Sequence, residues 1–316
     1  SGVAVALGCG PSAVGTDGAG SIRIPASLNG VFGVKPTYLR IGTTGDRWDA
    51  NTVAHIGPIG QSTADLVDQL AATAGIDPDA AITRWAPDNH DANPWRAALG
   101  RGVKGARIGV LRNELKDADP AIAQLLVDAL KALEADGAVL VDVDIPLAAF
   151  VNGIGALAIG GETSANVADL YREHRPDFGH ELAILLGLMQ QVSAQDFLMA
   201  QRHRAALRRQ TAAALAGVDV LALPSTATTA PLYKSSEDRT AVLDTNATAA
   251  MTRFSFLGNL TGLPAGTVPI GLSAGLPVGL QFIGDAWDEA SVFAMMAQAE
   301  RAGLTELPRP KSWLGA

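Results

Sequence analysis

The chain contains very little cysteine and few aromatic or charged residues. Of its 316 residues, one is cysteine, 5% are aromatic and 18% are charged. The single thiol, Cys9, cannot form an internal disulfide, which excludes a disulfide framework and favours a reducing compartment. We therefore expect a cytoplasmic protein in which Cys9 is a small buried thiol.

An excess of positive charge and a long apolar run are also missing. The formal net charge is −8 and the isoelectric point is near 5.1, so the chain has no basic footprint for nucleic acid or an anionic membrane. No apolar run approaches the roughly 18 residues that a membrane helix needs. We therefore expect no binding to nucleic acid or to a membrane by this chain alone.

Patterns for metal or cofactor binding are weak. His174 and His180, six residues apart across a proline-containing break, do not have the spacing of metal ligands. Gly8-Cys9-Gly10 superficially resembles a dinucleotide-binding loop. However, no helix follows it directly, and no acidic residue ends a second strand roughly 20 residues further on. We therefore expect neither a metal nor a cofactor.

The chain does have enough apolar sequence for a large core. With 48% hydrophobic residues, it fits a single α/β domain over residues 1–316. Strand patterns at 107–111 and 139–143 flank a helical pattern at 120–135, and this spacing favours an α/β sheet. Further strands are expected at residues 13–16, 31–34, 219–224, 266–270 and 279–283.

Helical patterns cover much of the remaining chain. Such helices are expected at residues 2–7, 22–28, 62–75, 156–216 (with a break near 176–179) and 289–302. In the third of these, Ser62 can cap the N-terminus and Asp65 stabilises the first turn. Residues 77–99, which contain several prolines and two tryptophans, are expected to form a surface loop.

The most informative stretch runs from Gly15 to Ser21 and reads GTDGAGS. It presents one hydroxyl directly after small residues whose backbone N–H groups can be approached without obstruction. A serine nucleophile beside an oxyanion hole needs this arrangement. Asp17 and Arg23 carry opposite charges that can fix the shape of the loop. A short Gly-x-Gly-Ser alone is typical of a plain turn, so the interpretation depends on the longer string.

This longer string resembles the central motif of the amidase signature family. The likeness covers residues 15–26, 30–37 and 55–59, and it continues in order at 259–265 and 275–281. The resemblance implies a large mixed β-sheet with helices on both faces. It also implies hydrolysis of a carboxamide C–N bond through a Ser–Ser–Lys triad, without metal or histidine.

Carried onto this chain, the resemblance implies that Ser21 is the nucleophile that forms an acyl-enzyme. The oxyanion hole is expected to consist of the backbone N–H groups of Gly18, Ala19, Gly20 and Ser21. The start of the following helix supplies partial positive charge that suits an oxyanion. Ala19 stands where the motif usually has glycine, but its N–H is retained. Thr16, Asp17 and Arg23 are expected to support the loop.

The second serine and the lysine of the triad have no matching position in residues 1–316. In the family both precede the nucleophile, so we expect them upstream of Ser1 and interpret the chain as the C-terminal portion of a complete amidase. Because a serine hydroxyl is a poor nucleophile without a base, these residues alone should turn over amides hardly at all. Ser1 as an N-terminal nucleophile, or His55 in a Ser–His–acid site, are open substitutes.

Substrate selectivity is expected to come from segments that cover Ser21. Trp48, His55 and Thr226 are candidate pocket residues, and the mostly helical segment 156–216 is expected to form part of the substrate side. The expected partner is a small amide, and a homodimer stays open. Two alternative functions are the glutaminase subunit of a tRNA-dependent amidotransferase and a catalytically silent binding protein on the same fold.

Overall fold

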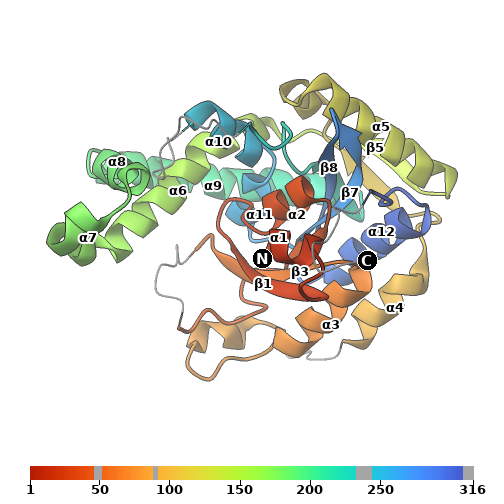
Figure 1. Cartoon of the computed structure of the whole chain (residues 1–316), viewed down its shortest axis with the longest axis horizontal. Helices are drawn as coiled ribbons and strands as arrows, with labels where there is room; N and C mark the ends of the chain where they lie inside the picture. The colour runs from red at the N-terminus through yellow and green to blue at the C-terminus, as the bar shows by residue number, and fades with distance from the viewer. Residues whose placement is uncertain (46–51, 88–91, 233–243, 309–316) are drawn as a thin grey trace.

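A single mixed β-sheet organises the fold. The structure is a computed structural model that describes residues 1–45, 52–87, 92–232 and 244–308. In these ranges an eight-stranded sheet has the order β1-β3-β2-β7-β8-β6-β4-β5 (Figure 1). The strands are β1 (Ser12–Asp17), β2 (Phe32–Lys35), β3 (His55–Gly60), β4 (Arg107–Val110), β5 (Val139–Asp142), β6 (Val220–Pro224), β7 (Ala265–Ser273) and β8 (Leu276–Gly284). β4 pairs in parallel with β5 and β6, and the other neighbours are antiparallel, so the predicted mixed sheet is confirmed.

Helices cover both faces of this sheet, as predicted. They are α1 (Gly2–Ala6), α2 (Arg23–Asn29), α3 (Thr63–Thr73), α4 (Asn93–Arg101), α5 (Pro120–Ala135), α6 (Val151–Asn166), α7 (Ala168–His174), α8 (His180–Met189), α9 (Ala194–Leu215), α10 (Thr245–Thr252), α11 (Phe256–Thr261) and α12 (Glu289–Arg301). Gly33 of β2 faces α2, whereas Gly266 of β7, the register partner of Val34, faces α12. Because successive strand residues point to opposite faces, α2 and α12 lie on opposite sides.

Most predicted elements form at the expected places. Ser62 accepts a hydrogen bond from the backbone N–H of Asp65, so the predicted cap of α3 is confirmed. Every residue of β6 is buried, which suits a continuous apolar run in the middle of a sheet. β3 was not predicted, because Pro58 and two glycines obscure its strand pattern. It nevertheless lies between β1 and β2 and pairs with both.

Two expectations from the sequence are wrong. Residues 77–99 are not all surface loop, because Pro94 stands at the start of α4, where proline is tolerated, and Trp95 is 4% exposed. The Trp95 ring packs edge-to-face on Phe293 of α12, with ring centroids 6.5 Å apart. Cys9, expected to be buried, is exposed in the turn after α1.

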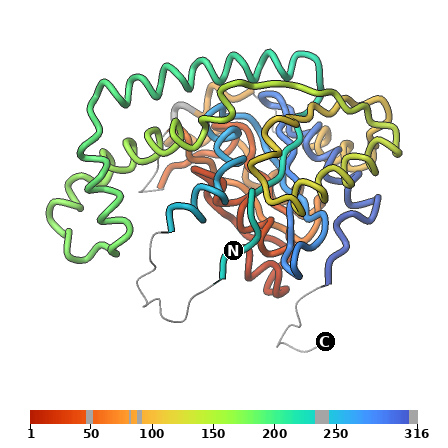
Figure 2. Tube along the Cα trace, turned by 90° about the horizontal axis from the view of Figure 1, so that it is seen from above, coloured from red at the N-terminus to blue at the C-terminus, as the bar shows by residue number. Residues whose placement is uncertain are grey.

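The predicted helical segment 156–216 is confirmed, and it forms an arm. Figures 1 and 2 place α7 and α8 at its far end, away from the sheet. α8 and α9 approach α6 at two adjacent glycines: a Cβ on Gly160 would lie 2.5 Å from the sulfur of Met189, and one on Gly161 would lie 2.9 Å from Phe197. Small residues on α6 therefore allow the arm to pack closely.

The helices of the described ranges do not individually match the dimensions of a bilayer. No single helix there is both long and apolar enough to cross a membrane. α8 and α9 would satisfy the length and composition criteria only when taken together, as a pair bent by 95°.

The correction at α4 leads to a prediction about stability. Trp95→Ala should lower the free energy of unfolding by about 3–5 kcal/mol, because it leaves a cavity between α4 and α12. Trp85→Ala is the matched control: Trp85 is 84% exposed, so the change should stay within about 0.5 kcal/mol. Urea unfolding of both variants measures the difference, and equal effects would contradict the packing described here.

Candidate active site

The loop that carries Ser21 connects the end of β1 to the start of α2. Ser21 is exposed, and its hydroxyl makes no hydrogen bond to any other described residue. Gly20 has φ of +116°, and a Cβ there would lie 2.5 Å from the Cβ of Ser255. Only glycine fits this position, because both the backbone conformation and the space exclude a side chain. The tight turn leaves the Ser21 hydroxyl at an open surface.

The carboxylate of Asp17 holds this loop together from inside. Its Oδ1 accepts a hydrogen bond from the N–H of Gly20 at 2.7 Å, and its Oδ2 accepts one from Ile22 at 3.2 Å. Arg23 donates to both oxygens, from Nη2 to Oδ1 and from Nε to Oδ2, each at 3.0 Å. The Asp17 and Arg23 side chains are 0% exposed. One buried ion pair therefore ties the end of β1 to the start of α2.

Arg23 extends the contacts of the loop to segments far away in the chain. Its Nη1 donates to the carbonyl of Ser255 at 2.9 Å and to Oε1 of Gln281 at 3.0 Å. Its Nη2 donates to Oδ1 of Asn259 at 2.6 Å, and Asn259 in turn donates to Oδ1 of Asp17 at 2.8 Å. The loop that carries Ser21 is thereby fixed to α11 and β8.

The charges of this network shift the ionisation of neighbouring groups. Burial would raise the pKa of Asp17, but the charge and hydrogen bonds of Arg23 and the amide of Asn259 hold it below its usual value. Burial, together with the nearby charge of Arg23, lowers the pKa of Lys35 well below its usual value. Lys35 Nζ donates to the carbonyls of Pro36 at 3.0 Å and Leu263 at 2.5 Å, so both of its hydrogen bonds end on the main chain.

His55 lies in β3 and is 3% exposed. Its Nδ1 is 2.7 Å from the carbonyl of Val53, which assigns the proton to this nitrogen, and Nε2 is buried with no partner among the described residues. Burial and the charge of Lys35 lower the pKa of His55 well below 6.5. The imidazole is therefore a neutral, enclosed group.

The predicted site residues differ in their exposure and in whether their N–H groups are already hydrogen-bonded. Gly18 and Ala19 are partly exposed beside Ser21, whereas the N–H of Gly20 is already used by Asp17. Thr16 is exposed on β1. Within the predicted hole, three N–H groups, those of residues 18, 19 and 21, thus remain for an oxyanion.

The two predicted pocket residues that the structure describes are buried and do not line an open pocket. His55 is enclosed, and Thr226 is 2% exposed with its hydroxyl donating to the carbonyl of Thr228 at 2.7 Å. Trp48 lies outside the described residues. Within the described ranges, no three His, Cys, Asp or Glu side chains are grouped so that they could hold a metal ion.

Sequence reasoning missed several residues that shape the loop. Asn259 and Gln281 are polar residues in apolar surroundings, and both lie in segments that carried the family resemblance, so that signal was available. Nothing in the sequence singled out Ser255, whose carbonyl accepts a hydrogen bond from Arg23. Nothing singled out Ile159 of α6 either, although its Cδ1 lies 2.8 Å from the position of a Cβ on Gly18.

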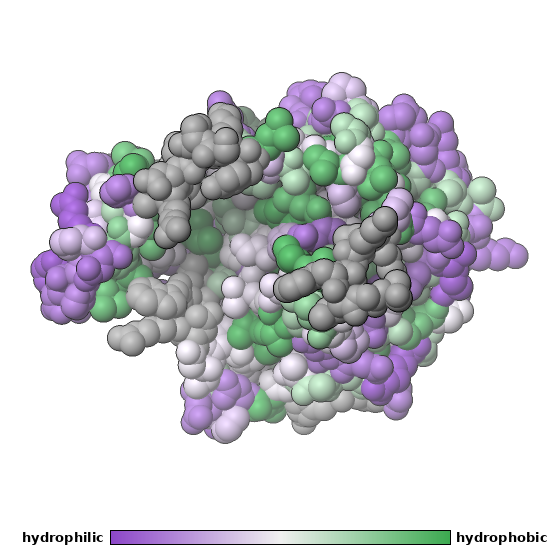
Figure 3. Space-filling model, viewed as in Figure 1, coloured by the Kyte–Doolittle hydropathy of each residue, from purple (hydrophilic) through white to green (hydrophobic). Residues whose placement is uncertain are grey.

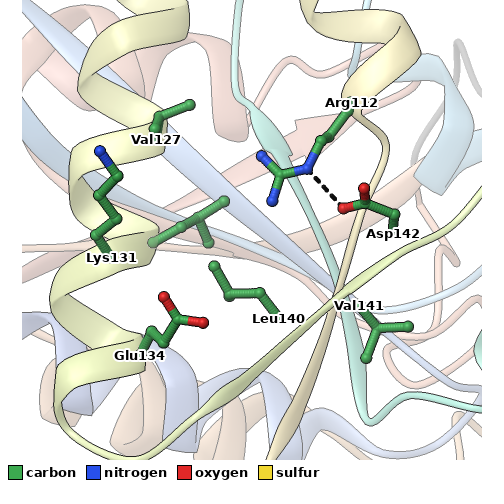
Figure 4. Close-up of a pocket in the computed structure, with 8 residues that line it drawn as sticks. Arg112, Val127, Lys131, Glu134, Leu140, Val141 and Asp142 are labelled. Atoms are coloured by element: carbon green, nitrogen blue, oxygen red, sulfur yellow. Dashed lines mark hydrogen bonds and ion pairs between the residues drawn. The ribbon is translucent and has the colours of Figure 1, made fainter.

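A separate groove lies at the opposite edge of the sheet (Figure 4). It has a volume of about 570 Å³ and is lined by Arg112, Val127, Leu130, Lys131, Glu134, Leu140, Val141 and Asp142. Arg112 donates a hydrogen bond to Asp142 at 2.6 Å across it. β5 and β1 are the two ends of the strand order, so this groove is remote from Ser21.

Comparison with known proteins identifies the family. The model of the Amidase family matches residues 1–293, and a solved crystal structure of an amidase superposes with a TM-score of 0.80 at 28% identity. The chain belongs to the Amidase family. Members of this family are therefore the proper comparison for the loop around Ser21.

Curated relatives include proteins of two kinds. A glutamyl-tRNA(Gln) amidotransferase subunit of Roseiflexus sp. (strain RS-1) is 34% identical over 92% of this chain and 63% of its own length. A fatty acid amide hydrolase of Oryza sativa subsp. indica is 32% identical over 98% of this chain and 52% of its own length. The chain thus spans between half and two thirds of the length of these relatives.

Solved structures agree over nearly the whole chain. The corresponding glutamyl-tRNA(Gln) amidotransferase subunit of Thermotoga maritima superposes with a TM-score of 0.80 at 26% identity, covering 99% of this chain and 68% of that one. The peptide amidase PAM, in complex with the inhibitor chymostatin, gives a TM-score of 0.80 at 27% identity. This superposition covers 98% of the present chain and 66% of PAM.

Burial of His55 predicts how stability depends on pH. Below about pH 6.5 the unfolded chain takes up a proton on His55 that the folded chain does not bind, so the free energy of unfolding falls as the pH falls. The slope is up to about 1.4 kcal/mol per pH unit for one such proton. Asp17 contributes no slope here, because its stabilisation is lost only below its usual pKa of 3.8.

Urea unfolding between pH 7.0 and 5.5 measures this slope. His55→Gln should lower the slope, whatever its effect on stability at pH 7, and any slope that remains belongs to Lys35, whose pKa burial also lowers. His203→Gln is the matched control, since His203 is exposed on α9. A slope that persists unchanged in His55→Gln would show that His55 is not the group responsible.

Proposed function

We propose that the protein carrying this chain hydrolyses the C–N bond of an amide, with Ser21 as the nucleophile. The observation that supports this most strongly is the position of Ser21. Its hydroxyl is exposed at the end of a loop that a fully buried ion pair holds in shape. Membership of the amidase family and the similarity to amide-cleaving relatives support the same reaction.

In the proposed reaction the Ser21 oxygen attacks the amide carbonyl carbon, and its proton passes to a base. The carbonyl oxygen becomes an oxyanion, which accepts hydrogen bonds from the N–H groups of Gly18, Ala19 and Ser21. One such donor typically lowers the barrier by about 3 kcal/mol. When the C–N bond breaks, the leaving nitrogen takes up the proton, and water then hydrolyses the acyl-enzyme to release the acid.

The base that receives the Ser21 proton is proposed to come from outside residues 1–316. Lys35 is buried and directs both hydrogen bonds to main-chain carbonyls. His55 is enclosed in β3, with its Nδ1 at the Val53 carbonyl. Neither group is placed to serve Ser21, so activation needs another residue.

A neutral amide is the substrate class we favour over free glutamine. Glutamine carries an ammonium and a carboxylate, which require charged partners in a binding site. The charged groups nearest the loop, Asp17 and Arg23, are buried and paired with each other. Glu162 of α6 accepts hydrogen bonds from the backbone N–H and the hydroxyl of Thr52. These four charged or polar groups are thus already engaged.

The second candidate function is the glutaminase subunit of a tRNA-dependent amidotransferase. The observation that favours it is the 34% identity to the amidotransferase subunit of Roseiflexus. This function would be established if the protein released ammonia from glutamine and did so faster when partner subunits and charged tRNA were added. Hydrolysis of neutral amides without partners would support the first.

Replacement of Ser21 tests the proposed reaction. In the protein that includes the residues encoded ahead of Ser1, Ser21→Ala should abolish amide hydrolysis and acyl-enzyme formation. It should change the free energy of unfolding by no more than about 0.5 kcal/mol, because Ser21 is exposed and makes no hydrogen bond to another described residue. Release of amine from a p-nitroanilide and mass spectrometry of the acylated protein provide the measurements.

Ser273→Ala, at the far end of β7, is the control and should keep full activity. If Ser21→Ala retained acylation, the nucleophile would lie elsewhere. If wild-type protein hydrolysed no amide and formed no adduct, the chain would be a binding protein on the amidase fold.

A further inference from the structure

We propose that Ile159 of α6 limits the size of the acyl group held at Ser21, and that this group is apolar. The inference rests on the function proposed above and concerns its substrate class. Ile159 is partly buried and packs against the hydrophobic core together with Ala19 of the nucleophile loop. It comes from a helix about 140 residues further along the chain, so the contact depends on the fold alone.

The first observation is the close approach of Ile159 to the loop. A Cβ on Gly18 would lie 2.8 Å from Cδ1 of Ile159, which is too short for two carbon atoms. The Ile159 side chain therefore occupies the space beside Gly18 that any other residue would fill. Since Gly18 is one of the proposed oxyanion donors, Ile159 stands next to the reacting carbonyl group.

The second observation is that other sides of the loop are closed. Ser255 and Ile24 would meet a Cβ on Gly20 at 2.5 and 2.7 Å, so no ligand group fits there. Behind the loop, Asp17 and Arg23 are fully buried. An acyl group bonded to the Ser21 oxygen therefore has no room beside Gly20 or toward the ion pair, whereas on the Gly18 side it meets Ile159.

The third observation is that Ile159 is held firmly in place. One turn further along α6, Glu162 accepts hydrogen bonds from Thr52, whose N–H is 2.9 Å from Oε2. Arg204 of α9 donates to the carbonyl and the hydroxyl oxygen of Thr52, each at 2.5 Å. Gly160 follows Ile159 in α6, and Met189 of α8 fills the space beside this glycine. A wall fixed from both sides limits size instead of yielding to a larger ligand.

The surroundings of Ile159 also specify the chemistry of the ligand. Ile159 and Ala19 both pack against the hydrophobic core, so the described contacts on this side of the loop are apolar. Figure 3 shows the surface hollowed between the helical arm and the rest of the molecule. Glu162 of α6 and Arg204 of α9 are charged, but both are engaged with Thr52. The wall therefore favours an uncharged, aliphatic acyl group.

Kinetics with a series of anilides test the proposal in the protein that includes the residues encoded ahead of Ser1. The probes are the p-nitroanilides of acetic, hexanoic and decanoic acid. Ile159→Ala should raise the ratio of kcat/KM for decanoyl over acetyl by roughly tenfold, the usual effect of a changed apolar contact. Ile76→Ala removes the same atoms from an exposed position after α3 and should leave the ratio unchanged.

An unchanged ratio in Ile159→Ala, with activity retained, would overturn the inference while the proposed function stands. An equal shift in Ile76→Ala would overturn it as well. If the wild type hydrolysed none of the anilides, or if hydrolysis survived Ser21→Ala, the proposed function would fail and the inference with it.

A pair of variants tests the contact itself. Gly18→Ala should slow acylation at least roughly tenfold, because the new methyl group collides with Ile159 and displaces an oxyanion donor. Gly18→Ala combined with Ile159→Ala should recover most of this loss, since the space is then free. A double variant as slow as Gly18→Ala would show that Ile159 does not set the space beside the loop.

Discussion

The buried ion pair between Asp17 and Arg23 is the interaction on which the rest of the site depends. Both side chains are 0% exposed, so each charge has lost its hydration. Such a pair is stable only when further hydrogen bonds satisfy the remaining donors and acceptors, and here Asn259 and Gln281 do so. Breaking one partner would leave an uncompensated buried charge, so the pair opposes any rearrangement of the loop between β1 and α2 that separates them.

This constraint shapes the chemistry that the loop can perform. Asp17 uses the N–H of Gly20, which leaves a defined set of donors around Ser21. Donors held before the substrate arrives do not need to reorganise during the reaction, and this is where most oxyanion stabilisation comes from. Burial, together with the charge of Lys35, lowers the pKa of His55, so this enclosed imidazole adds no positive charge near the loop at neutral pH. The site then has an apolar wall at Ile159 and no unpaired charge on Asp17 or Arg23.

The sequence predicted the elements with strong periodicity and the loop with a dense motif. The mixed sheet, the cap at Ser62 and the opposite charges of Asp17 and Arg23 were all visible in short stretches. Contacts between distant segments were not. The amide of Asn259 reaches Asp17 across 242 positions, and Ile159 reaches Gly18 only because the arm packs as it does. The use of the Gly20 N–H depends on backbone angles that composition does not specify.

The most direct test of this account is a crystal structure of the protein after reaction with an alkyl fluorophosphonate. The account predicts phosphorus bonded to the Ser21 oxygen, with the phosphonyl oxygen about 2.7–3.1 Å from N–H groups among residues 18, 19 and 21. The alkyl chain should lie against Ile159. Phosphorus on another residue, or a phosphonyl oxygen that points away from these N–H groups, would contradict the central claim that this loop is the catalytic site.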